Sequence, residues 1–149
     1  ADLVRLVVNE LPMLKNLIEL ERTTLSARSR RLFTLSALYT ATGALLSGRE
    51  KLVPQERANL ALRYWGLVFE QFAEWGEVRD GKLSAGEVRQ DFIHSHGVVL
   101  HALGRVGNAV FDEFQDNWDA KLQNLKNINW RRSHQSLWEG RYGSTNNRY

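Results

Sequence analysis

Residues 32–46 read LFTLSALYTATGALL, and apolar or small side chains occupy most positions of this stretch. Folded as a helix, the segment is apolar on almost all of its faces. A helix of this kind is stable where other elements surround it, so we place it in the middle of a helical bundle. Ser47 and Gly48 end the helix.

Apolar residues recur at helical spacing on both sides of this central segment. Pro54 has the position of a first-turn proline, and Ser84 with Glu87 forms a capping box at the start of the longest helix. No alternating stretch is long enough to demand a sheet. The predicted helices cover residues 2–10, 13–20, 32–46, 54–75, 84–114 and 116–127. We therefore predict an all-α fold, one domain over residues 1–149 built as a bundle of about five to six helices.

Three glycines interrupt the predicted 84–114 helix, at Gly97, Gly104 and Gly107. Each costs helix stability, about 1 kcal/mol relative to alanine. We expect the compensation to be the close approach of a neighbouring backbone. The stripe predicted to face the core comprises Val88, Phe92, Val99, Leu103, Val106 and Val110.

Composition bounds the class of protein. The chain has 149 residues, of which 43% are hydrophobic and 25% charged, as in a folded water-soluble domain. It contains no cysteine, which excludes disulfides, thiol nucleophiles and Cys-ligated zinc. No run approaches 18 apolar residues and no export signal opens the chain, so we expect neither a membrane span nor secretion.

Charge is unevenly distributed along the chain. The net charge is only +3, but fifteen of the twenty cations are arginine, the residue best suited to bidentate phosphate contacts. Residues 22–31 contain four arginines and no acid, and residues 121–149 contain six cations and one acid. This segregation indicates a polyanion as partner.

Arg28, Arg30 and Arg31 stand where the central helix is predicted to begin, after Ser26. Backbone N–H groups, hydroxyls and guanidinium groups at a helix start bind phosphate oxygens. The alternative is a solvated first turn, or arginines paired with Glu19 and Glu21.

Arg131, Arg132 and Arg141 alternate with Trp130, Trp138 and Tyr142 in the irregular C-terminal segment. Basic residues between aromatic ones suit backbone contact combined with base stacking. A Trp-anchored strap that leaves its arginines exposed explains the pattern equally well.

Asp91, His94 and His101 share one long face of the predicted 84–114 helix. Seven residues separate the two histidines, about 10.5 Å along a helix axis, which is too far to share one ion. A polar seam between helices is therefore the simpler interpretation, and metal-dependent catalysis the less favoured one. We expect no catalytic residue, no metal and no cofactor.

Three stretches together resemble one family. They are LSARSRRLFTLSA at residues 25–37, GEVRQDFIHSHGVVLHALGRVGN at residues 86–108, and NWRRS with LWEGR at residues 129–133 and 137–141. The chain resembles the C-terminal helical part of the DndB family of DNA sulfur modification proteins. The resemblance covers most of residues 10–141 and depends on the order and spacing of these short sequence motifs.

The resemblance implies a cytoplasmic bacterial protein that binds double-stranded DNA and regulates, as a repressor, transcription of the phosphorothioation genes. It implies no enzymatic activity. Proteins of this family also carry an N-terminal DGQHR-type domain, which is not visible here, so the chain is expected to be a fragment or the ordered remainder of a longer protein. Residues are expected to be missing between 143 and 144, where the family has a longer basic segment.

Two further hypotheses belong to other classes. In the first, the bundle is an oligomerisation or protein-interaction module, for a second copy or for other phosphorothioation proteins, and DNA is contacted elsewhere. In the second, Asp91, His94 and His101 form a metal-dependent active site. Under the leading hypothesis the DNA-binding residues are Arg28, Arg30, Arg31, Arg131, Arg132 and Arg141.

Overall fold

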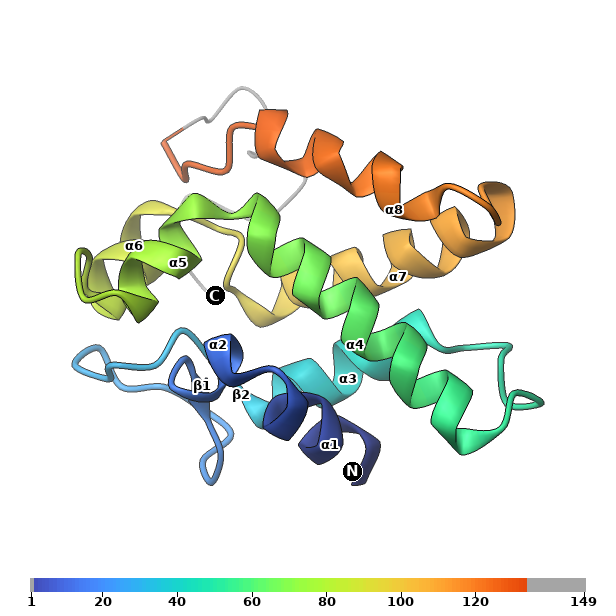
Figure 1. The fold of residues 1–149 in the computed structure, drawn as a ribbon. Helices are drawn as coiled ribbons and strands as arrows, with labels where there is room; N and C mark the ends of the chain where they lie inside the picture. Colours follow the sequence, from blue (N-terminus) through green and yellow to red (C-terminus); the bar gives the residue numbers. More distant parts are fainter. Residues whose placement is uncertain (1, 134–149) are drawn as a thin grey trace.

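A computed structural model describes residues 2–133 of the chain (Figure 1). Trp138, Arg141, Tyr142 and the junction at residues 143–144 lie outside the described residues. The elements are α1 (Asp2–Glu10), α2 (Pro12–Lys15), β1 (Ile18–Glu19), β2 (Phe33–Thr34), α3 (Leu35–Leu45), α4 (Pro54–Gln71), α5 (Ala73–Arg79), α6 (Ala85–Asp91), α7 (Gly97–Glu113), α8 (Trp118–Lys121) and the 3-10 helix η1 (Leu122–Asn127). The predicted fold class is confirmed, since the chain is a mostly helical single domain.

Helices α3 and α7 pack against each other at the centre of the fold. A Cβ atom on Gly104 would overlap the carbonyl oxygen of Ala41, and one on Gly107 would lie 2.5 Å from Leu45 Cδ1. The expected close approach of a neighbouring backbone is therefore confirmed at Gly104, whereas the atoms close to Gly107 belong to the side chains of Leu45 and Tyr64. Gly97, by contrast, begins α7 and has ordinary van der Waals space, 3.6 Å from Ala37 Cβ.

The aromatic core lies between α4 and this central pair. Tyr64 and Trp65 are fully buried on α4, the tyrosine hydroxyl donates to the Leu103 carbonyl, and Trp65 Nε1 donates to Thr42 Oγ1 over 3.0 Å. Burial raises the pKa of the Tyr64 hydroxyl far above its ordinary range. Each of these two buried donors thus finds its acceptor inside the core, as burial of a polar group requires.

Two of the predicted long helices are broken. The 54–75 helix breaks at Phe72, whose extended φ of −108° and ψ of 93° separate α4 from α5. The 84–114 helix breaks at residues 92–96, between α6 and α7. There the Ile93 N–H donates to the Trp130 carbonyl over 3.0 Å, so a distant segment takes the donor that a continuous helix would need. Val106 lies 46% exposed and not in the core as predicted, because the buried face of α7 runs through Leu100, Gly104, Gly107 and Phe111.

The predicted 13–20 helix is also shorter than expected. Only α2 forms, and the chain then runs into β1, which pairs in parallel with β2 in the register Ile18 to Phe33. Helix α3 starts at Leu35, where the Thr34 hydroxyl caps it by accepting the Ala37 N–H over 3.0 Å. Residues 28–31 therefore lie in a loop before a short strand, and the prediction that they open a helix is wrong.

Within residues 2–133, no helix has both the length and the apolar character to cross a membrane.

Candidate nucleic-acid interface

Residues 22–31 form an extended excursion that we call the arginine loop. Its two ends are held side by side by the β1–β2 pair, because Ile18 pairs with Phe33. Inside the loop the Ser29 N–H donates to the Ser26 carbonyl over 3.0 Å, which makes a turn of the four residues 26–29. Figure 1 shows this segment at the end of the molecule that carries α5 and α6.

The guanidinium group of Arg89, on α6, lies under this turn. It donates to the carbonyl oxygens of Ser26 and Ala27 over 3.1 Å each and of Ser29 over 3.0 Å, and also to that of Arg31. Burial lowers the pKa of Arg89, but a guanidinium remains charged at any pH at which proteins fold. One half-buried cation thus orders four carbonyl dipoles from a segment about sixty positions earlier in the chain.

The arginines of the loop have no carboxylate partner among the described residues. Arg28 and Arg30 are exposed, and neither guanidinium forms an ion pair with a carboxylate within residues 2–133. Arg31 is half-buried, and its guanidinium donates to the carbonyl of Asn16, so it helps to close the loop.

The predicted alternative, pairing with Glu19, is not what the structure shows. Glu19 Oε2 accepts the backbone N–H groups of Glu21 over 2.9 Å and Arg22 over 3.2 Å. These hydrogen bonds, and secondarily the nearby charges of Arg22 and Arg31, lower the pKa of the Glu19 carboxyl. The loop therefore keeps most of its positive charge facing solvent.

Residues 130–132, which we call the strap, lie against the link between α6 and α7. Arg131 forms an antiparallel bridge with Phe92, and the Arg132 N–H donates to the Asp91 carbonyl over 2.9 Å. The Trp130 ring packs 5.3 Å from that of Phe72, and its Nε1 donates to the Leu125 carbonyl over 2.8 Å. Trp130 is therefore an anchor of the strap and does not present its ring for base stacking.

Arg132 and the arginine loop are connected through one residue. Arg132 Nη2 lies 3.3 Å from the Arg89 carbonyl and 3.0 Å from His96 Nε2. His96 Nε2 is itself 2.8 Å from the same carbonyl. The two predicted arginine clusters thus meet at Arg89, the loop through its side chain and the strap through its backbone.

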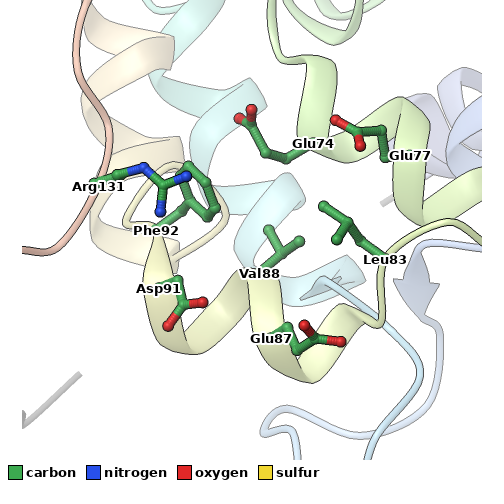
Figure 2. A pocket seen from close by; sticks show the side chains of 8 residues that line it. All are labelled: Glu74, Glu77, Leu83, Glu87, Val88, Asp91, Phe92 and Arg131. Atoms are coloured by element: carbon green, nitrogen blue, oxygen red, sulfur yellow. The ribbon is translucent and has the colours of Figure 1, made fainter.

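Arg131 has a different environment. It lines a pocket of about 270 Å³ beside α5 and α6, and Figure 2 shows its guanidinium over the ring of Phe92, with Cζ 4.8 Å from the ring centroid. The wall also contains four carboxylates, from Glu74, Glu77, Glu87 and Asp91, and the apolar side chains of Leu83 and Val88. A phosphate that reached Arg131 would meet these carboxylates as well.

The residues proposed for metal chemistry are separated. Asp91 is exposed at this pocket, whereas His94 is 0% exposed in the break between helices and His101 lies on α7. The expectation that they share one helix face is wrong, because the helix is interrupted between them. The described part of the chain contains no group of three potential ligands arranged around one ion.

His94 has structural partners on both ring nitrogens. Nε2 lies 2.7 Å from Glu74 Oε1, and Trp75 Nε1 lies 3.3 Å from Nδ1. A neutral ring with its proton on Nε2 satisfies both contacts. Burial lowers the pKa of His94, although Glu74 opposes that shift, while the hydrogen bond from His94 lowers the pKa of Glu74.

Arg89 is the residue of this site that sequence reasoning missed. A signal was present: Arg89 follows Ala85 by four residues, so a helix that buries Ala85 also points Arg89 partly inward. An arginine in that position needs buried acceptors, and the pattern does not tell which segment supplies them.

The fold and site define a mostly helical domain in which one half-buried arginine, Arg89, holds an exposed, arginine-rich loop. The model of the DndB family, described as DNA-sulfur modification-associated, matches residues 1–148. The chain therefore belongs to the DndB family, which associates it with DNA sulfur modification. Neither a curated protein nor a solved structure gives a significant match.

Proposed function

We propose that this protein is a non-enzymatic, DNA-binding transcriptional regulator of DNA phosphorothioation genes and that it acts as a repressor in the cytoplasm. Its partner is double-stranded DNA, contacted first through the arginine loop. The observation that carries the proposal is the exposure of Arg28 and Arg30 on a loop with no carboxylate partner within residues 2–133.

Phosphate binding suits this loop for a physical reason. Arginine offers a planar fork of donors that matches two phosphate oxygens, and such contacts fix a protein on the duplex without reading its sequence. Ser26 and Ala27 are small and exposed beside Arg28, so they leave room for a phosphate backbone to approach. The loop explains affinity for DNA, whereas a preference for particular genes requires further contacts.

The other arginines predicted to contact DNA contribute unequally in this proposal. Arg132 Nη2 lies 3.3 Å from the Arg89 carbonyl and beside His96, and Arg131 lines a pocket with four carboxylates, so we assign both a smaller share than Arg28 and Arg30. Arg141 stays a prediction. Association with other phosphorothioation proteins, or with a second copy, also stays a prediction.

Two glycines of α7 pack against the same chain and not against a partner. Gly104 and Gly107 face Ala41, Leu45 and Tyr64 of the same chain. They therefore do not favour the interaction-module hypothesis over DNA binding.

A matched pair of double variants tests the proposal. Arg28→Gln with Arg30→Gln removes two unpaired charges, and Arg63→Gln with Arg79→Gln removes two charges that are paired with Asp119 and Asp80. The probe is a labelled 25-base-pair duplex of mixed sequence, titrated at several salt concentrations. We expect the loop variant to bind at least about tenfold more weakly, with a salt slope smaller by about 2, and the control variant to lose much less.

Equal losses in both variants would show that only net charge matters and would refute the assignment to the loop. The regulatory part of the proposal has its own test. At physiological salt the protein should prefer a duplex from upstream of the phosphorothioation genes over the mixed-sequence duplex. Binding without such a preference would leave a DNA-binding protein that is not a regulator.

A further inference from the structure

We infer that Arg89 is a positioning residue for the proposed DNA contacts: its guanidinium sets the shape of the arginine loop, and its backbone carbonyl couples that shape to the strap. The inference rests on the proposed function for its consequence in DNA binding. Its structural part, the ordering of the loop by Arg89, can be tested without DNA.

The loop has little internal structure of its own. Between residues 22 and 31, the described hydrogen bonds within the loop are the Ser29 N–H to the Ser26 carbonyl and the Arg31 N–H to Ser29 Oγ, at 3.0 and 3.1 Å. Most of the loop is exposed, so packing contributes little to its order. The four carbonyls that converge on Arg89 are therefore its main restraint.

The geometry of these contacts requires an arginine. A guanidinium presents five donors in one rigid plane, which lets two terminal nitrogens each reach two carbonyl oxygens, as Nη1 and Nη2 of Arg89 do. A lysine ammonium keeps the charge but offers three donors from a single point. Lysine at position 89 would thus preserve the electrostatics and lose the convergence.

This arrangement also favours an anion at the outer side of the loop. Carbonyl oxygens repel phosphate, and here those of Ser26, Ala27 and Ser29 are turned inward to Arg89. A carboxylate in place of the carbonyls would hold the arginine as firmly but would cancel its charge. Anchoring by carbonyls orders the loop while it leaves the cation uncompensated.

The backbone of Arg89 extends the effect to the strap. Its carbonyl is the shared acceptor for Arg132 Nη2 and His96 Nε2, at 3.3 and 2.8 Å. A displacement of α6 at Arg89 therefore moves the loop and the strap together. The two basic segments, about one hundred positions apart, belong to one mechanical unit.

Two variants separate positioning from charge, and one matched variant controls for charge loss. Arg89→Met keeps the apolar stem and removes the fork, Arg89→Lys keeps the charge, and Arg63→Met removes an arginine that is paired with Asp119 away from the loop. We measure limited trypsin cleavage after Arg28 and Arg30 under native conditions, thermal unfolding, and titration of the 25-base-pair duplex at several salt concentrations.

We expect cleavage in the loop to become at least about tenfold faster in both Arg89 variants and unchanged in Arg63→Met, because cleavage of a native chain requires local opening. DNA binding should weaken at least about fivefold in both Arg89 variants, with a smaller salt slope. Arg89→Lys should not rescue either property despite its unchanged charge.

Several outcomes would overturn the inference. If Arg89→Lys binds and resists cleavage like the wild type, Arg89 acts through its charge and not through position. If the variants lose only thermal stability while loop cleavage and salt slope stay the same, Arg89 is merely a core residue. If the wild type does not bind the duplex, the proposed function fails, and faster loop cleavage in the variants would still support the structural part alone.

Discussion

The two sides of α6 carry arginines in opposite settings. On one side Arg89 is surrounded by carbonyl oxygens under the arginine loop, and on the other Arg131 lies over Phe92 in a pocket with four carboxylates. Carbonyl dipoles order a cation without cancelling it, whereas carboxylates compensate it. The count of arginines in a segment therefore does not tell whether the segment offers charge to a partner; the groups around each guanidinium do.

The largest expected effect is at Gly104, in the α3–α7 contact at the centre of the fold. Gly104→Ala places a Cβ against the Ala41 carbonyl, which is backbone and cannot turn away. We expect a loss of about 3 kcal/mol in the free energy of unfolding, measured by urea denaturation. Gly43→Ala is the control, since nothing lies within 4 Å of its Cβ position, and it should be neutral or stabilising. Similar losses in both variants would contradict the close packing.

Acid should destabilise the fold. Burial lowers the pKa of His94 and of His96, so below about pH 6.5 the unfolded chain binds more protons than the folded chain. The free energy of unfolding should therefore fall as the pH drops from 7 to 5. The lowered pKa of Glu74 adds a further loss below about pH 4.5.

The variant His94→Gln should flatten this dependence between pH 7 and 5 without abolishing it, because His96 remains. Urea denaturation at each pH provides the measurement. A pH dependence as steep as that of the wild type would show that His94 is not protonated on unfolding in this range.

The smallest expected effect concerns the charge of Arg131 and the carboxylates that line its pocket. Glu87→Gln with Asp91→Asn removes two carboxylates from the wall that Arg131 shares. If these two carboxylates keep Arg131 from binding DNA phosphates, the affinity of the double variant for the mixed-sequence duplex should rise about threefold at low salt. Adding Arg131→Gln to the double variant should then remove this gain. A gain that survives Arg131→Gln would mean that the acids act only through net charge.

The outline of the fold could be predicted because it depends on local periodicity. Trp118, Leu122 and Leu125 point inward as their spacing indicates, and Ser84 caps α6 by accepting the Glu87 N–H over 3.1 Å. Gly104 could be predicted as a site of close backbone approach, because packing must offset the cost of a glycine inside a helix, but the same reasoning failed for Gly97. The site was predictable in part, because Arg28 and Arg30 stand in an acid-free stretch.

The sequence by itself determined the helical class, the central position of the helix predicted over residues 32–46 and the basic character of residues 22–31, because periodicity and charge are properties of neighbouring residues. Only the tertiary structure decided where helices break and which arginines stay uncompensated. The Ile93 N–H pairs with Trp130 and the Arg89 guanidinium with carbonyls about sixty positions away, and partners so distant along the chain leave no periodic trace in it.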